Sequence, residues 1–199
     1  MTTTPWALIS GGRSTGKSGT ASRVAAALAA RGVRVGGVIQ DAVEEGGERV
    51  GYVATRVDAP ATRLTLARRG APPEGTRSGA VHTVCSFAFD GDAFAAVRGW
   101  LRDGAGRHEV VIVDEVSKLE VSGEGHHAAI EDALGGDALV VLVVRADHLF
   151  AVVERYRLED AVATLDAGDD AGLPAFVDAV AAAVSARSSD AGGGSAGAA

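Results

Sequence analysis

A short stretch near the start of the chain has the residue types of a phosphate-binding loop. Residues 11–18 read Gly-Gly-Arg-Ser-Thr-Gly-Lys-Ser and satisfy the pattern G-x-x-x-x-G-K-[ST]. Glycines let backbone N–H groups converge on phosphate oxygens, and a helix that starts at the loop adds the positive end of its dipole. The lysine of the pattern reaches the β- and γ-phosphates, and the final hydroxyl ligates Mg²⁺. The residues expected to bind the nucleotide are Gly11, Gly12, Arg13, Ser14, Thr15, Gly16, Lys17 and Ser18.

The lysine of this loop stands out against the rest of the composition. The chain uses arginine almost everywhere and has lysine only at Lys17 and Lys118. An ammonium group is a compact point charge, whereas a guanidinium is bulkier and fits a phosphate cradle differently. Retention of lysine at position 17 therefore favours a true phosphate site and a catalytic role for Lys17.

A second pattern lies about a hundred residues further on and ends in two acids. Residues 109–113 form the apolar end of a buried strand, and Asp114 and Glu115 follow it directly. Ligands of open α/β sheets bind at the carboxyl ends of the strands, so this is a Walker B type of arrangement. We expect Asp114 to hold Mg²⁺ together with Ser18, and Glu115 to polarise the attacking water as a general base.

The remaining reactive side chains each have a functional interpretation and a plainer structural one. Arg145 follows the apolar run 139–144, so we expect it at the same sheet edge, where it stabilises transition-state charge or simply points to solvent. His126 and His127 are adjacent and point about 100° apart on a helix, so they cannot share a metal ion and are expected to be solvated. Cys85 is the single cysteine, which excludes an intrachain disulfide, and is expected to be a small core residue.

These residues require a scaffold of buried strands alternating with helices. Apolar runs at 6–10, 33–40, 109–113, 138–144 and 161–165 predict strands, and helices are expected at 17–31, 92–102, 126–134, 147–157 and 173–186. Gly32 is placed at a left-handed helix end, and Asp90 or Asp92, and later Asp147, are expected as N-caps. Continuous apolar strands separated by helices predict a three-layer α/β fold with a mostly parallel, RecA-like sheet.

The segment between about residues 41 and 79 departs from this alternation. A polar turn at 44–48, a β-type run at 49–57 and a short strand at 63–67 predict a small antiparallel insertion, followed by a Pro/Gly-rich loop at 70–79. A further strand is expected over 81–89. The prediction is one nucleotide-binding domain over residues 1–187, with a disordered Gly/Ala/Ser-rich tail at 188–199.

Composition restricts the surroundings of the chain. Its 199 residues suit one domain, and the net charge of −7 argues against a nucleic-acid surface, which needs a basic face. The longest apolar run, 138–144, is far shorter than the roughly 20 residues that span a bilayer, and the start of the chain lacks a signal-peptide pattern. We expect a cytoplasmic protein without membrane insertion, and the sequence points to no protein partner.

Several stretches together resemble a known family. The loop 11–18, the runs Val35–Asp41 and Glu45–Tyr52, and the run Val113–Glu120 are similar, in this order, to small nucleoside-triphosphatases typified by the thermophile enzymes. The likeness extends from Ala7 to about Val144 and is greatest to a bacterial branch, some members of which are encoded beside molybdenum-transport genes.

This resemblance implies a nucleoside-triphosphatase that uses Mg²⁺, with Asp114 and Glu115 serving metal and water. Lys118 and Glu120 are implied to shape the following loop. Ser117 stands where the thermophile enzymes commonly have glycine, so the loop turns differently here or its two charges are merely solvated.

Two other functions use the same loop. A small-molecule kinase transfers the phosphoryl group to an acceptor, and Arg63, Arg68, Arg69 and Arg77 offer the cations of a kinase lid. A slowly hydrolysing adaptor linked to molybdenum metabolism would instead change shape on nucleotide binding. No base-reading motif is recognisable, so the sequence leaves ATP and GTP open as substrates.

Overall fold

A computed structural model of the chain describes residues 4–77, 81–84 and 86–192. Cys85, with its predicted core position, and residues 193–199 of the expected tail lie outside the described residues. None of the helices in the described ranges is long and apolar enough to cross a membrane.

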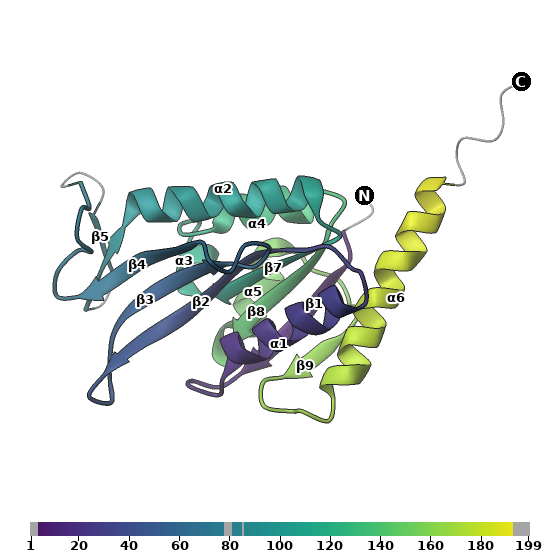
Figure 1. The fold of residues 1–199 in the computed structure, drawn as a ribbon, viewed down its shortest axis with the longest axis horizontal. Coiled ribbons are helices and arrows are strands. Elements are labelled where there is room, and N and C mark those ends of the chain that lie inside the picture. Colours follow the sequence, from purple (N-terminus) through teal and green to yellow (C-terminus); the bar gives the residue numbers. More distant parts are fainter. Residues whose placement is uncertain (1–3, 78–80, 85, 193–199) are drawn as a thin grey trace, which may run out of the picture.

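The strands form one twisted sheet of nine strands in the order β5-β6-β4-β3-β2-β7-β8-β1-β9 (Figure 1). Five of them, β2, β7, β8, β1 and β9, are parallel, and β8 lies between β1 and β7. This is the RecA-like order, and it confirms the α/β fold with a mostly parallel core. The strands are β1 (Trp6–Gly11), β2 (Val35–Glu45), β3 (Glu48–Arg56), β4 (Arg63–Arg69), β5 (Val81–Val84), β6 (Phe87–Asp90), β7 (Val110–Val116), β8 (Leu139–Arg145) and β9 (Thr164–Asp166).

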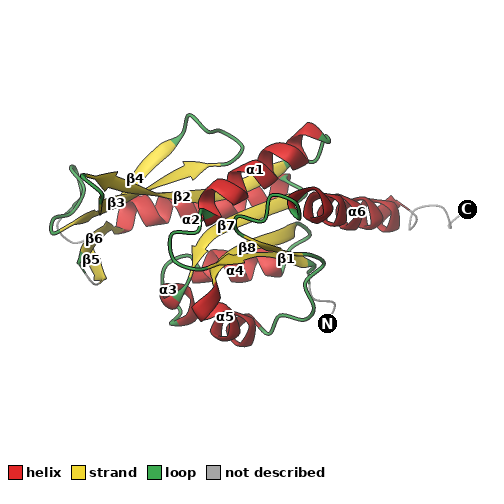
Figure 2. Cartoon of the chain, turned by 90° about the horizontal axis from the view of Figure 1, so that it is seen from below, coloured by secondary structure: helices red, strands yellow, loops and turns green. Residues whose placement is uncertain are grey.

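Helices cover both faces of the sheet, which gives three layers. Helices α1 and α6 pack on one face, and α2, α4 and α5 pack on the other (Figures 1 and 2). The helices are α1 (Lys17–Ala30), α2 (Gly91–Arg107), α3 (Lys118–Val121), α4 (His127–Leu134), α5 (Leu149–Tyr156) and α6 (Leu173–Gly192), with a 3-10 turn at Ala146–His148.

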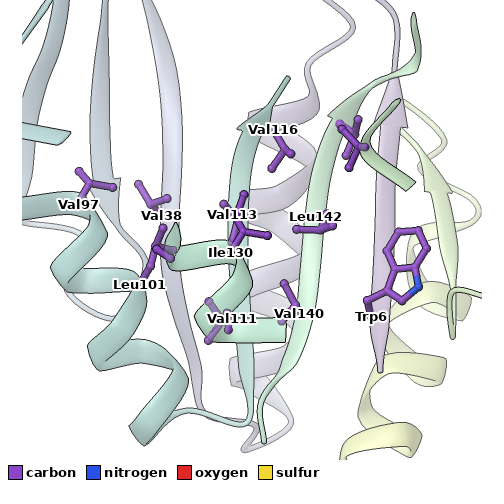
Figure 3. Close-up of a cluster of buried hydrophobic side chains, with 14 of the residues drawn as sticks. Trp6, Val38, Val97, Leu101, Val111, Val113, Val116, Ile130, Val140 and Leu142 are labelled. Carbon is purple, nitrogen blue, oxygen red and sulfur yellow. The ribbon is translucent and has the colours of Figure 1, made fainter. Parts of the chain in front are cut away.

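Strands β7 and β8 carry the core because both of their faces are buried. Val111 and Val113 of β7 pack toward α2 and α4 (Figure 3). Val110 and Ile112 pack toward α1 and α6 on the other face. Successive side chains of a strand point to opposite faces, so an uninterrupted apolar run is what a strand between two helical layers requires. Each fully buried side chain of this kind contributes about 1.5–3 kcal/mol.

The antiparallel part of the sheet differs from its prediction in extent. Strand β2 does not end near Gln40 but continues to Glu45 and pairs antiparallel with β3. Strands β3, β4, β6 and β5 extend the sheet in the same antiparallel manner. The predicted single strand at 81–89 is wrong, because the chain reverses within it and β5 pairs with β6 as a hairpin. A run of apolar and β-branched residues carries no signal that separates one long strand from two short ones.

Helix ends settle one open alternative and correct the predictions at two places. Asp90 is the N-cap of α2, and its carboxylate accepts hydrogen bonds from the backbone N–H groups of Asp92 and Ala93. Asp147 is not the N-cap of α5, which is His148, because a 3-10 turn precedes the helix and the Asp147 carboxylate pairs with Arg145. Helix α6 continues to Gly192, beyond its predicted end at residue 186.

Candidate active site

The loop after β1 is closed by contacts between its own residues. Lys17 is the first residue of α1, is buried, and donates from Nζ to the carbonyl oxygen of Gly12 at 2.7 Å. The Thr15 hydroxyl donates to the same carbonyl at 3.1 Å. Gly16 caps α1 with a φ of 80°, a left-handed conformation that favours glycine and turns the loop into the helix. The loop therefore ends on the N-terminus of a helix, as a phosphate cradle requires.

The acid of β7 faces the helix layer that begins with this loop. Because Val113 points toward α2 and α4, alternation turns Asp114 toward the face covered by α1. Asp114 is fully buried and accepts hydrogen bonds from the backbone N–H groups of Gln40 at 3.0 Å and Glu115 at 2.7 Å. Burial raises its pKa to about 7, and the Ser18 hydroxyl and the Gln40 N–H group oppose that rise.

Ser18 and Asp114 come together through β2. The Ser18 hydroxyl donates to the carbonyl oxygen of Gln40 at 3.1 Å, and the N–H of the same residue donates to Asp114. The Ser18 hydroxyl and the Asp114 carboxylate are hard oxygen ligands. Within the described residues, the carboxylate forms no ion pair with a basic side chain. The donor set fits Mg²⁺, which keeps several waters and takes few protein ligands besides phosphate oxygens.

Histidine and thiolate metal sites are not favoured by the remaining side chains. Over the described ranges, no group of three or more His, Cys, Asp or Glu residues is placed to hold a metal ion by itself. A cation at Asp114 would thus need phosphate oxygens and water to complete its shell, which matches a site that binds metal with nucleotide.

Glu115 leaves the strand in a different direction from Asp114. Between Val113 and Val116 the pairing with β8 shifts, and Glu115 takes a φ of 58°. Such a bulge places an extra residue in one strand and re-aims its side chains. Glu115 lines a small cavity of about 60 Å³ together with Gln40, Tyr52 and Phe94. The bulge thus separates the two acids, one turned toward Ser18 and the other toward this cavity.

Arg145 lies across from the loop in the sheet. It ends β8 and stands opposite Gly11 in the parallel pairing of β1 with β8. Its guanidinium donates to Asp147 at 2.5 Å and contacts His148 at 2.6 Å. The Asp147 carboxylate raises the pKa of Arg145, with a smaller contribution from Glu115. The arginine is therefore close enough to the second acid to share its electrostatic environment.

Two polar residues beyond the acids are buried. His126 is 1% exposed, so the expectation that it is solvated is wrong, and Glu120 is 2% exposed, which excludes the solvated alternative for that residue. Glu120 accepts hydrogen bonds from the N–H groups of Ser117 and His126, and burial raises its pKa to about 7. Burial lowers the pKa of His126 to about 4. Lys118 is exposed at the start of α3, in line with the solvated alternative.

His127 is also less exposed than expected. Its ring contacts the hydroxyl of Tyr156 at 3.1 Å and the guanidinium of Arg155 at 3.0 Å. The physical reason is the same for both histidines: α4 packs against neighbouring helices at its N-terminus, which local periodicity does not reveal.

Gln40 is the residue that sequence reasoning missed. It is 6% exposed and bonds to Ser18, to Asp114 and to His126. The available signal was its position at the carboxyl end of the apolar run 33–40, the edge at which the other polar residues were expected.

Two of the four arginines considered for a kinase lid form ion pairs elsewhere in the structure. Arg69 pairs with Glu48 within the antiparallel strands, and Arg77 pairs with Asp92 at the start of α2. Neither contact directs a cation at the loop 11–18.

A RecA-like sheet whose first strand ends in this loop defines a P-loop nucleotide-binding protein. A family model described as "NTPase" matches residues 7–167. The chain belongs to this NTPase family and is a nucleoside-triphosphatase, a hydrolase.

Individual relatives agree with this assignment. The chain is similar to the nucleoside-triphosphatases THEP1 of Methanothermobacter thermautotrophicus, 28% identical over 74% of this chain and 80% of that protein, and of Pyrococcus abyssi, 27% identical over 75% and 76%. Among solved structures, a human cancer-related nucleoside triphosphatase matches with a TM-score of 0.67 and 23% identity over 88% of this chain and 97% of that one. THEP1 from Aquifex aeolicus matches with a TM-score of 0.63 and 16% identity over 87% and 97%, and both structures show the fold.

Proposed function

We propose that the chain hydrolyses nucleoside triphosphates, ATP or GTP, to the diphosphate and phosphate in a Mg²⁺-dependent reaction at the carboxyl edge of β1 and β7. The observation that carries the proposal is the hydrogen-bonded link from Ser18 through Gln40 to Asp114. It brings the hydroxyl of the loop and the acid of a distant strand to one place. A site with Lys17 and Asp114 on separate surfaces would have served no common nucleotide.

Each residue of the proposed site has a role that follows from its functional group. The backbone N–H groups of residues 12–18 and the ammonium of Lys17 bind the phosphate oxygens, and Lys17 exchanges its contact with Gly12 for the nucleotide. Ser18 and Asp114 would hold Mg²⁺, which would supply positive charge at the β- and γ-phosphates. Glu115 accepts the proton of the attacking water as the general base.

Arg145 stabilises the charge that develops on the phosphates. Its place opposite Gly11, at the end of the neighbouring strand, supports this role, and its bond to Asp147 holds the guanidinium at the sheet edge. The residues offer no group that selects a base, so the proposal names both ATP and GTP. The likeness to the bacterial branch encoded beside molybdenum-transport genes stays a prediction from the sequence.

The test is phosphate release from ATP, GTP and CTP with and without Mg²⁺. Lys17→Ala is expected to weaken nucleotide binding by about 100-fold or more, since one charge-assisted contact to phosphate is lost. Glu115→Gln keeps the shape of the side chain but not its basicity, so binding is kept while turnover falls by roughly 100-fold. Binding is measured by equilibrium titration with a fluorescent nucleotide.

The matched control is Arg31→Ala, at the opposite end of α1 from Lys17. Arg31 pairs with Asp178 at the surface, so its loss removes one positive charge from the same helix without touching the loop. Normal turnover by Glu115→Gln would show that the assigned base is wrong, and hydrolysis that is independent of Mg²⁺ would refute the metal assignment.

A further inference from the structure

We propose that the side-chain amide of Gln40 is a positioning residue that sets the direction of the Glu115 carboxylate by locking the peptide unit between Asp114 and Glu115. The inference rests on the proposed function, because it assigns Gln40 a part in placing the general base. The groups involved are the peptide plane between Asp114 and Glu115 and the buried side chains that hold it.

Both polar ends of this peptide plane are bonded. The Gln40 side-chain amide donates from Nε2 to the carbonyl oxygen of Asp114 at 2.9 Å, and the N–H of Glu115 donates to the Asp114 carboxylate at 2.7 Å. A peptide plane held at both ends cannot flip without breaking one buried and one partly buried hydrogen bond, and a buried polar group left unpaired costs about 1–3 kcal/mol.

The lock matters because Glu115 is in an uncommon conformation. Its φ of 58° lies in the left-handed region, which costs a residue with a Cβ roughly 1–2 kcal/mol. Rotation of the preceding peptide would release this strain and carry the Glu115 side chain away from its cavity. The Gln40 bond opposes that rotation, so the direction of the base depends on a residue 74 positions away in the sequence.

The amide itself is oriented by His126. Nε2 of Gln40 lies 3.2 Å from Nε2 of His126, within hydrogen-bond distance. Because the Asp114 carbonyl only accepts, the amide nitrogen and not its oxygen must face it, and His126 then accepts through an unprotonated Nε2. Burial between Phe94 and Gln40 keeps that ring neutral, since it lowers the pKa of His126 to about 4. His126 thus holds the amide in the orientation that the lock needs.

The main chain and the side chain of Gln40 bond to different groups, so the role of the side chain can be tested by itself. The backbone groups of Gln40 bond to Ser18 and to the Asp114 carboxylate, and any residue at position 40 keeps them. Only the side chain bonds to the Asp114 carbonyl. Substitution of the side chain should therefore keep the backbone bonds of Gln40 to Ser18 and Asp114 and disturb the base.

The experiment compares Gln40→Met with the unmodified protein. Methionine has a similar length and no hydrogen-bond donor, so we expect kcat for Mg-nucleotide to fall by roughly 10- to 100-fold, as for other residues that orient a catalytic group. The KM and the affinity for fluorescent nucleotide with Mg²⁺ should stay within about threefold. His126→Leu should lower kcat in the same way, and His126→Gln, which offers an amide oxygen as acceptor, should restore most of it.

The control is Thr55→Val in the neighbouring strand. Thr55 of β3 pairs with Ile39, next to Gln40, and its buried hydroxyl has no hydrogen-bond partner within the described residues. This substitution changes the packing of the same region without touching the lock, so kcat should be unchanged. A fall in kcat for Thr55→Val equal to that for Gln40→Met would reduce the Gln40 effect to general packing and overturn the inference.

A double variant separates this inference from the assignment of the base. If Gln40 acts through Glu115, the turnover of Gln40→Met with Glu115→Gln should equal that of Glu115→Gln alone. Full additivity, or a loss of nucleotide affinity in Gln40→Met with unchanged kcat, would overturn the positioning role. Normal turnover in the single variant Glu115→Gln would instead remove the proposed base, whatever Gln40 does.

Discussion

The phosphate loop and the acid bulge lie at the same sheet edge but are held in opposite ways. In the loop, Lys17 and Thr15 both bond to Gly12, no more than five residues away. In the bulge, Asp114 bonds to Gln40, 74 residues away, and Gln40 also bonds to His126, which is 86 residues from Gln40 in the sequence. The first structure is local, and the second exists only when β2, β7 and α4 are assembled.

Substitutions in the loop are expected to affect binding or catalysis alone. Substitutions around the bulge are expected to affect both catalysis and stability. A change in the loop should remove one of the proposed phosphate contacts and leave the core in place. A change around the bulge disturbs buried polar groups whose partners belong to three elements, and an unpaired buried group is costly. Substitutions in the two regions should therefore differ in how far they affect unfolding.

The largest effect is expected where β2 meets β7. Gly37 has a φ of 114°, and a Cβ there would lie 2.1 Å from the backbone oxygen of Ile112. Backbone cannot move aside as a flexible side chain can, so Gly37→Ala should lower the free energy of unfolding by about 4 kcal/mol or more. Urea denaturation measures this loss.

The matched control for Gly37 is Gly99→Ala in α2, where nothing lies within 4 Å of an added Cβ. Alanine should stabilise that helix by about 0.5–1 kcal/mol. A loss below about 1 kcal/mol for Gly37→Ala would break the claim that close packing of β2 on β7 supports the bulge.

An intermediate effect is expected from His126 at low pH. Its pKa is about 4 when folded and about 6.5 when unfolded, so the unfolded chain binds more protons between these values. Stability from the neutral ring is therefore complete above about pH 6.5 and is lost as the pH falls through 4. At pH 5 the loss relative to His126→Gln should be roughly 2 kcal/mol. Urea denaturation of both proteins at pH 7.5 and pH 5 gives the difference.

Two ionisable groups near His126 bear on the interpretation of the pH dependence of stability. Arg98 of α2 adds to the depression of the histidine pKa, whereas Glu120 of α3 has a raised pKa of about 7. The folded state holds the Glu120 proton between about pH 4.5 and 7, so Glu120 alone makes the protein more stable as the pH falls. Both proteins keep Glu120, so only their difference reports His126, and a difference independent of pH would contradict the burial of a neutral ring.

The smallest effect is expected from Arg145, on the loop side of the comparison. Its ion pair with Asp147 is partly exposed, so Arg145→Ala should change the free energy of unfolding by less than about 0.5 kcal/mol. Turnover should fall by at least about tenfold, or 1.4 kcal/mol, because a cation near the transferred phosphate is lost. Phosphate release and urea denaturation are measured on the same preparation.

Arg102→Ala serves as the control for Arg145. Arg102 forms a surface pair with Asp132 away from the sheet edge, so its removal should change neither turnover nor stability. Equal turnover in Arg145→Ala and the unmodified protein would leave Arg145 as a strand-end arginine that points to solvent.

Much of the scaffold could be predicted because its signals are local. The apolar runs of β7 and β8 predicted buried strands, since both faces of each strand need apolar residues. Gly32, with a φ of 82°, follows α1 as predicted, because a left-handed helix end favours glycine at any position in a fold. The turn between β5 and β6 had no such signal and was missed.

The sequence by itself determined the glycine-rich loop between the first strand and the first helix, the α/β alternation and a buried strand that carries Asp114 and Glu115 near its carboxyl end. Only the tertiary structure decided that Glu115 sits on a bulge, that His126 and Glu120 are buried, and that Gln40 joins Ser18 to Asp114. Loop and strand patterns depend on neighbours within a few residues. The burial and pairing of a polar group depend on which distant elements cover it, and that is fixed only when the sheet and its helices come together.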